Sequence, residues 1–196
     1  MASVAENVIA NKLLEAAVQL FATKGYPATS TREIVEAAGV TKPMLYYYFQ
    51  SKEGLLAAAI GHFLDAFYQR LREVLSQPRE PYQQLVELVW AHLDFCQGHM
   101  PLARLFYALY FGPDDQKGLV DLKKYTDVGH ELLMQGVDRA VAAGLVRPDC
   151  REDLGLALHG MINIWTIAAL NGEAELNFDI ARKIIDDLLR GFRNSL

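Results

Sequence analysis

The sequence predicts an all-α protein of about nine helices, in which a long helix joins a small N-terminal three-helix head to a larger C-terminal helical domain. Three observations predict this class. A helix-turn-helix pattern occupies residues 29–48, apolar residues recur at helical spacing through most of the chain, and glycines and prolines divide it into helix-length segments. We expect the head to span residues 1–55 and the second domain to span residues 56–196. A chain of 196 residues is long enough for both.

The first predicted helix, residues 7–24, carries one apolar stripe and ends at a glycine. Its apolar residues are Ile9, Leu13, Ala17, Leu20 and Phe21, followed by Gly25. Apolar residues at this spacing lie on one face of a helix. We therefore expect this helix to act as scaffold behind the helix-turn-helix.

Capping residues define the two helices of the motif. Ser30 and Glu33 have the spacing of a capping box, in which each side chain satisfies a backbone N–H of the other. Gly39 stands where a helix commonly ends through a left-handed residue. Thr41 is placed to cap the second helix, and Pro43 falls in its first turn, where a missing N–H costs nothing. The sequence therefore predicts helix, tight turn and short second helix.

The second helix of the motif displays an unusual set of polar aromatic residues. Leu45 and Phe49 share one face and are expected to point inward, which leaves Lys42, Tyr46 and Tyr47 outward. Tyrosine hydroxyls donate to phosphate oxygens, and no acidic residue occurs between positions 41 and 52. This predicts a DNA-contacting surface. Its expected residues are Thr31, Arg32, Thr41, Lys42, Pro43, Met44, Tyr46, Tyr47, Tyr48 and Lys52.

Residues 10–60 resemble the DNA-binding head of the tetracycline-repressor (TetR-type) regulators. The matching features are Phe21, Gly25-Tyr26, Thr29 to Arg32, Ala38-Gly39-Val40, Leu45-Tyr46, Phe49 and Ser51-Lys52-Glu53. The resemblance covers the first third of the chain, and the rest matches only in length and helical character. It implies that residues at the positions of Pro43, Tyr46, Tyr47 and Lys52 approach DNA and that the Lys42 position reads base edges. It also implies an effector cavity and a four-helix dimer interface.

After the helix-turn-helix motif, the sequence predicts a series of helices that continues to the end of the chain. Ser51 is placed to cap a helix that reaches Ser76 and spans nearly 40 Å at ~1.5 Å per residue, long enough to connect the two domains. Further helices are expected over residues 82–97, 102–111, 118–143 and 154–170, with a last helix over residues 180–192. Asp149 and Glu152 resemble a capping box before the expected helix at residues 154–170. Gly129 and Gly136 lie on one face, which fits either close helix packing or room for a ligand.

The last two helices carry more apolar surface than one protomer needs. Residues 154–170 are apolar nearly all round, and the last helix has a complete apolar stripe opposite a charged face. Excess apolar surface on adjacent helices predicts self-association as a homodimer. The expected interface residues are Leu158, Ile162, Ile184, Leu188 and Phe192.

Aromatic residues of the middle helices are candidates for an effector cavity. Aromatic stripes are more often core, but the TetR resemblance implies a cavity here for a small apolar or amphipathic effector. The candidate residues are Trp90, Phe95, Phe106, Tyr107, Tyr110, Met134 and Trp165. His92, Cys96 and His99 could share a helix face as soft-metal ligands, but no fourth ligand is indicated, so neither a metal nor a cofactor is predicted.

Charge and composition set the remaining limits. The net charge is −5, and residues 1–55 contribute none of it, since five basic and five acidic residues balance there. Cys96 and Cys150 form no CxxC pair, which favours a reduced cytoplasmic protein. No signal peptide, uninterrupted apolar stretch of 18 residues or catalytic motif is found, so neither a membrane protein nor an enzyme is predicted.

These observations predict a cytoplasmic, nucleoid-associated DNA-binding regulator. We expect a ligand-responsive repressor that binds a palindromic double-stranded operator as a homodimer. Two alternatives stay open: a transcriptional activator, and a helical small-molecule-binding protein with a vestigial head. The second alternative would bind ligand tightly and have no affinity for DNA.

Overall fold

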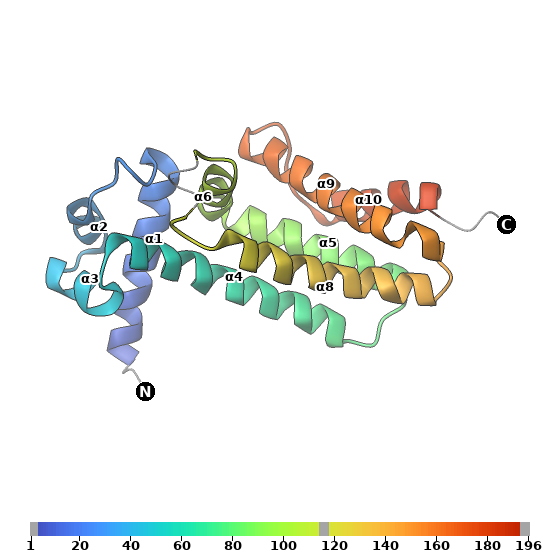
Figure 1. Ribbon diagram of the computed structural model, residues 1–196, viewed down its shortest axis with the longest axis horizontal. Helices are drawn as coiled ribbons and strands as arrows, with labels where there is room; N and C mark the ends of the chain where they lie inside the picture. The colour runs from blue at the N-terminus through green and yellow to red at the C-terminus, as the bar shows by residue number, and fades with distance from the viewer. Residues whose placement is uncertain (1–3, 114–117, 193–196) are drawn as a thin grey trace. The chain divides into compact units, whose positions relative to one another are not determined.

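The computed structural model describes residues 4–113 and 118–192 (Figure 1). Within these ranges the chain forms nine α-helices, one short 3₁₀ turn and no strand, which confirms the all-α class. The helices are α1 Val4–Lys24, α2 Thr31–Ala38, α3 Lys42–Phe49, α4 Lys52–Ser76, α5 Pro81–Gly98, α6 Met100–Tyr110, α8 Leu122–Ala142, α9 Arg151–Leu170 and α10 Phe178–Phe192. The 3₁₀ turn is Pro148–Cys150.

The chain folds into two compact units whose boundary differs from the expected one at residues 55/56. Unit 1 contains Met1–Leu64 and Met100–Leu122, and unit 2 contains Asp65–His99 and Lys123–Leu196. Helix α6 belongs to unit 1 because it packs against α1. The first half of α4 lies in unit 1 and its second half in unit 2, so one continuous helix belongs to both.

Unit 1 has a small apolar core under the helix-turn-helix. Its apolar side chains at 2% exposure or less come from α1, α2, α3, α4 and α6; they are Leu13, Ala17, Phe21, Ile34, Leu45, Leu55, Leu56, Ala59, Ile60 and Leu105. Helix α1 therefore acts as the scaffold that the sequence predicts. Figure 1 shows α2 and α3 beside α1, and Leu45 is the residue by which α3 is anchored to this core.

Unit 2 packs its helices closely at glycines. Helix α10 lies against α5 and α9. A Cβ added at Gly136 would collide with Leu88 of α5, and one added at Gly155 would collide with Met134 of α8. Of the two readings offered for Gly136, close helix packing is therefore the one that the structure supports.

Several helices start two to four residues from the predicted position, and at α8 and α9 the local geometry also matters. Helix α8 begins at Leu122 rather than near residue 118. Helix α9 begins at Arg151, and its N-cap residue Cys150 makes no side-chain capping bond, so the expected capping box of Asp149 and Glu152 does not form. Pro148 starts a tighter 3₁₀ turn here, and Glu152 pairs with Arg151 instead.

Candidate nucleic-acid interface

A complete capping box starts the first helix of the motif. The Ser30 hydroxyl accepts from the Glu33 N–H at 3.3 Å, and the Glu33 carboxylate accepts from the Ser30 N–H at 2.8 Å. Thr31 follows at the first helical position, and the exposed Arg32 donates to Glu36 at 2.7 Å. The box fixes the first turn of α2 by satisfying the backbone N–H groups of Ser30 and Glu33.

Glu33 also joins α2 to α1 through an ion pair with Lys24. The hydrogen bond from Lys24 lowers the pKa of Glu33 to about 2, and the Ser30 backbone and hydroxyl contribute further. The carboxylate therefore stays ionised at any physiological pH. Sequence reasoning identified its capping role but missed this second contact with the preceding helix.

The turn between the two helices depends on a left-handed glycine. Gly39 has φ +66 and ψ 34, and its N–H donates to the Glu36 carbonyl at 3.2 Å. The next N–H, from Val40, donates to the Val35 carbonyl at 3.0 Å. Because a side chain at this φ is strained, glycine is the residue that ends α2 here without cost.

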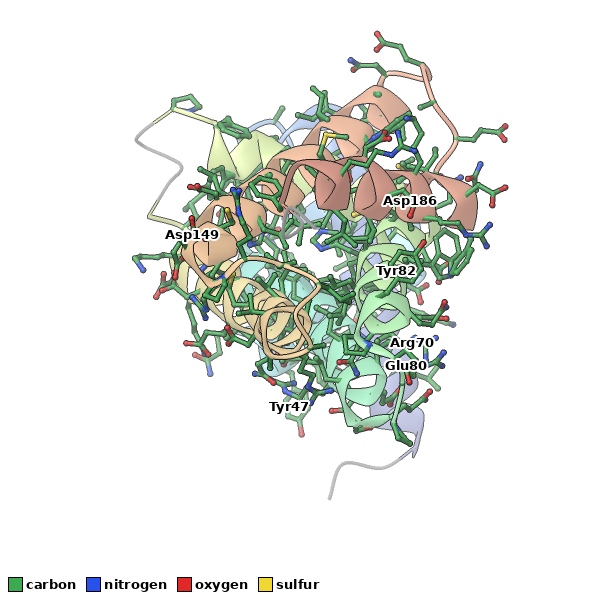
Figure 2. All side chains as sticks on the ribbon, turned by 90° about the vertical axis from the view of Figure 1, so that its right-hand side faces the viewer. Tyr47, Arg70, Glu80, Tyr82, Asp149 and Asp186 are labelled. Carbon is green, nitrogen blue, oxygen red and sulfur yellow. The ribbon has the colours of Figure 1, made fainter. Side chains whose placement is uncertain are left out.

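Helix α3 presents its polar aromatic residues to solvent. Tyr47 is 73% exposed, Tyr46 43% and Met44 37%, whereas Leu45 between them is 0% exposed. Figure 2 shows Tyr47 extending away from the ribbon. Thr41, Lys42 and Pro43 are exposed as well. Packing therefore uses one face of α3 and leaves the opposite face available for a partner.

Two of the predicted contact residues of this segment, Tyr48 and Lys42, have aromatic partners within the protein, and a third, Thr41, lacks an expected bond. Thr41 occupies the N-cap of α3 but makes no side-chain capping bond, contrary to expectation. Tyr48 is half-buried and lies edge-on to Tyr47, with ring centroids 5.0 Å apart. The ammonium of Lys42 lies 5.8 Å from the centroid of the Tyr46 ring, a cation–π geometry that holds positive charge on the exposed face.

Lys52 has a structural role that sequence reasoning missed. Its ammonium donates to the backbone carbonyls of Tyr26 and Thr29 at 2.8 Å each and lies 4.1 Å from the Tyr26 ring centroid. Two of its three N–H donors are thereby used inside unit 1. Lys52 thus holds the loop before α2 onto the start of α4.

Tyr26 and Glu53 complete this attachment. The Tyr26 hydroxyl donates to Glu53 at 2.7 Å. Burial, and secondly this bond, raises the pKa of Tyr26, while the same bond lowers the pKa of Glu53. Thr29, 1% exposed, donates to the Gly25 carbonyl at 2.8 Å. The loop that positions α2 is therefore built from side chains whose order in the sequence resembles the TetR pattern.

The predicted effector residues are divided between the two units. Phe106, Tyr107 and Tyr110 belong to unit 1, where Phe106 stacks on Tyr110 with centroids 6.0 Å apart. The four others belong to unit 2, and they are Trp90, Phe95, Met134 and Trp165. Met134 is 5% exposed and packs under Gly155, so it is a core residue.

Phe95 is the centre of an aromatic stack in unit 2. It stacks on Phe67 of α4, with centroids 4.8 Å apart, and on His99, with centroids 4.5 Å apart. The Nδ1 atom of His99 lies 2.9 Å from the Phe95 carbonyl, so this nitrogen is used within α5. Among the described residues, no group of three His, Cys, Asp or Glu side chains could hold a metal ion.

The predicted dimer residues are mostly core residues of the protomer. Leu158, Ile162 and Ile184 are at most 1% exposed because α5, α9 and α10 pack on one another, so these three have no side-chain surface to give to a partner. Leu188 and Phe192 are half-buried. The large exposed apolar residues of α9 lie on its opposite face; they are Leu156, 75% exposed, and Ile164, 57% exposed.

The segment Pro148–Leu170, which contains α9, is long and apolar enough to cross a membrane by length and composition alone. One third of its apolar window, 33%, is buried within the protein. A core or interface helix of a soluble protein has the same features, so this is weak support for a membrane span.

Comparison with known proteins places these features in a family context. The model for bacterial regulatory proteins of the tetR family matches residues 13–59. The HTH-type transcriptional repressor KstR2 of Mycolicibacterium smegmatis is 29% identical over 150 residues, which cover 74% of this chain and 70% of that protein. The HTH-type transcriptional activator FasR of the same organism is 31% identical over 144 residues, which cover 69% and 66%.

The fold has a solved counterpart along almost its whole length. The transcriptional regulator FadR from Bacillus subtilis, solved in complex with stearoyl-CoA, superposes with a TM-score of 0.80 at 18% identity, covering 93% of this chain and 99% of that one. At this identity the likeness concerns the fold alone. The relatives are transcriptional regulators, which are not enzymes as a class.

Proposed function

This chain is a TetR-type transcriptional regulator, and from that premise we propose that it is a ligand-responsive repressor that binds a palindromic operator as a homodimer. The observation that carries the proposal is the outward display of Tyr46 and Tyr47 on a short helix anchored by Leu45. With Lys42 beside them and no acidic residue between positions 41 and 52, this face suits a polyanionic groove. Residues 1–55 then serve DNA binding, and residues 56–196 serve effector binding and dimerisation.

The DNA contacts are assigned by exposure. Lys42, Pro43, Met44, Tyr46 and Tyr47 are exposed on α3 and lie in or along the major groove. The remaining contacts go to the phosphate backbone and come from the ends of the neighbouring helices and from the half-buried side of α3; they are Thr31, Arg32, Thr41, Tyr48 and Lys52.

The homodimer forms through the outward face of α9. Leu156, Gly160 and Ile164 follow one another at intervals of four residues, so they lie on one face, and a Cβ added at Gly160 would meet nothing. Exposed Leu and Ile side chains on both sides of a small residue suit close packing against a second copy of the same helix. Two-fold symmetry then places the two α3 helices about one duplex turn apart, ~34–36 Å, or a multiple of it.

An apolar or amphipathic effector controls this dimer. It binds unit 2 better in a conformation that misplaces the two α3 helices, and its differential affinity releases the operator. Helix α4 transmits the change because it belongs to both units. The stearoyl-CoA complex of FadR supports an effector with a large apolar part. The protein acts in the cytoplasm, associated with the nucleoid, and carries out no catalysis.

Activation is the second candidate function. Its support is the similarity to FasR, whose name describes an activator. A repressor places its operator over the promoter, and an activator places it upstream, so the position of the bound site separates the two functions.

Selection of genomic fragments by the purified full-length protein tests the proposal. We expect enrichment of an inverted repeat whose half-sites are spaced by whole duplex turns, and binding as a dimer by fluorescence anisotropy. Fragments without shared sequence, together with no measurable affinity for duplex DNA, would instead support the small-molecule-binding protein with a vestigial head.

A further inference from the structure

We infer that His92 recognises the polar end of the effector and that this effector carries an uncharged hydrogen-bonding group on an apolar body. The inference rests on the proposed function and deepens it, because it names the chemical class of ligand that unit 2 accepts. It concerns a single side chain of α5 and the aromatic residues around it.

The surroundings of His92 are apolar on one side. The ring of Phe67 from α4 lies edge-on to the imidazole, with centroids 4.8 Å apart, and continues into the stack of Phe95 and His99. Cys96, one turn further along α5, is 8% exposed. This wall suits the apolar body of a ligand, since aromatic rings bury much area with little loss of conformational freedom.

The imidazole of His92 has no hydrogen-bond partner among the described residues. Its intramolecular interactions there are the ring contact with Phe67 and an electrostatic one with His159. Every fully buried side-chain nitrogen or oxygen in the same part of the chain does have a partner. The ring nitrogens of His92 must therefore keep some accessible surface, and the side chain is indeed only partly buried.

The other histidines of unit 2 use their nitrogens differently. His99 is bonded to the Phe95 carbonyl, and His130 and His159 are bonded to each other at 3.1 Å. His92 is therefore the histidine of unit 2 that has both nitrogens available for a bound molecule. A polar group that is partly buried and unpaired gains more from a ligand than one already bonded within the protein.

The charge state of His92 selects against an anion. Burial, and secondly the charge of His159, lowers the pKa of His92 to about 4, so the imidazole is neutral at pH 7. A neutral imidazole offers one donor and one acceptor. Burial raises the pKa of Cys96 to about 11, so this thiol, one turn along α5, is neutral too. A ketone, hydroxyl or thioester carbonyl fits, whereas a carboxylate would be desolvated without a cation.

A matched series of ten-carbon probes tests the inference on the full-length protein. The affinities of 2-decanone, 1-decanol and decanoate are measured at pH 7.5, without DNA, from the fluorescence of Trp90 and Trp165. We expect the ketone and the alcohol to bind at least about tenfold more tightly than decanoate. His92→Phe, which keeps an aromatic ring but no hydrogen bond, should weaken ketone and alcohol binding about tenfold, as expected for one lost hydrogen bond.

The controls separate the role of His92 from general effects. His62 is an exposed histidine of α4 in unit 1, so His62→Phe should leave all three affinities unchanged. If His92→Phe lowers the melting temperature substantially, His92→Gln replaces it as the variant, and we expect the ketone affinity to stay within about threefold because an amide donates and accepts as well.

Three results would overturn the inference. They are decanoate binding as tightly as the ketone, undiminished ketone affinity in folded His92→Phe, and no binding of any probe. Operator binding by the unliganded protein is measured in parallel. Its absence would refute the proposed function alone, whereas normal operator binding with the wrong probe preference would refute only the assignment of His92.

Discussion

Tyr47 is the most exposed of the large hydrophobic residues of α3, at 73%, and no core contact depends on its hydroxyl. We expect Tyr47→Ala to weaken operator binding about five- to thirtyfold, the equivalent of ~1–2 kcal/mol, through loss of a phosphate or base contact. The free energy of unfolding should change by less than about 0.5 kcal/mol. Fluorescence anisotropy and urea unfolding measure the two effects.

Tyr110 supplies the control for this substitution. It lies on α6 in the same unit and is 46% exposed, so Tyr110→Ala removes a comparable side chain away from α3. Equal losses of operator affinity in the two variants would show that the effect of Tyr47 is not a contact with DNA.

Lys42 and Lys52 form a second matched pair. Both are expected to approach phosphates, but only Lys52 donates hydrogen bonds to backbone carbonyls of the protein. Lys52→Met removes the donor from two backbone carbonyls, so the free energy of unfolding should fall by about 1–3 kcal/mol. Lys42→Met should leave the free energy of unfolding unchanged and reduce the salt slope of operator binding by about 1 per protomer. A melting temperature lowered equally by both substitutions would contradict the role given to Lys52.

His92 makes stability depend on pH in a defined direction. Its pKa is about 4 in the folded protein against about 6.5 unfolded, so the unfolded chain binds the proton more readily between these values. Stability is therefore complete above about pH 6.5 and falls as the pH decreases towards 4. We expect a loss of roughly 1–3 kcal/mol, less than full burial would give, because the side chain keeps some exposure.

Urea unfolding at pH 7.5 and pH 5 measures this loss in the wild type and in His92→Phe. The pKa of His159 is lowered too, by burial and by His130, so the substitution should remove part of the pH dependence rather than all of it. An unchanged pH dependence in His92→Phe would rule out the perturbed imidazole.

At the residue scale, the sequence predicted the features of the site that depend on near neighbours, and it missed those that depend on contacts between residues far apart in the chain. The capping box of Ser30 and Glu33 and the left-handed Gly39 depend on neighbours within a few residues, and both are confirmed. The two bonds of Lys52 reach back 23 and 26 residues, and no spacing rule in a single sequence encodes such a distance. The Tyr26 hydroxyl bond to Glu53 was missed for the same reason.

Helix α4 is anchored at its C-terminal end by side chains of two other helices. Arg139 of α8 donates to the Leu75 carbonyl at 2.7 Å and to the Gln84 side chain at 2.8 Å. Gln84, 1% exposed, donates in turn towards the Val74 carbonyl at 3.3 Å. A cation at the negative end of the helix dipole and bonds to its last carbonyls both stabilise this end.

Arg139→Met should therefore lower the free energy of unfolding by about 1–3 kcal/mol, because it leaves a buried amide oxygen unpaired. Chemical denaturation measures the change. Arg182→Met is the control, since the Arg182 side chain is 54% exposed and lies on the outward side of α10. Equal stability of the two variants would show that Arg139 does not anchor α4.

At the element scale, the sequence located helices well and their exact starts less well. Apolar periodicity and the prolines at 78 and 81 placed α4 and α5 within a residue or two. The start of α9 was mispredicted because the capping-box pattern at Asp149 competes with a proline that begins a 3₁₀ turn. The two-residue pattern does not distinguish a capping box from a 3₁₀ turn. Here Arg151 also pairs with Glu152, the carboxylate that the capping box would need.

Self-association is the prediction that belongs to the whole molecule. If the exposed face of α9 forms the dimer, Leu156→Asp places a charge at the symmetric contact and should yield monomers. Light scattering after size-exclusion chromatography measures the mass. Operator affinity should fall at least about a hundredfold, because a monomer contacts a single half-site and loses the advantage of linked binding.

A charged substitution elsewhere on the surface tests whether any new surface charge disrupts the dimer. Phe111 is 70% exposed and belongs to unit 1, so Phe111→Asp should leave a dimer. A dimeric Leu156→Asp protein with full operator affinity would place the interface on another face.

Which face of α9 is free could not be derived from the sequence, because this helix is apolar nearly all round. Only the packing of α5, α9 and α10 shows that Leu158 and Ile162 are buried in the protomer and that Leu156 and Ile164 are not. The place of α6 in unit 1 could not be derived from the sequence for a similar reason. Nothing in the local sequence of α6 shows that it packs on α1.

The most direct test of the central claim, that α3 presents a DNA-binding face, is the salt dependence of binding to the selected operator. If Lys42 and Lys52 of two subunits each neutralise a phosphate, the logarithm of the association constant should fall with the logarithm of salt concentration with a slope of about −3.6 or steeper. A slope near zero, or one unchanged in Lys42→Met, would contradict the account.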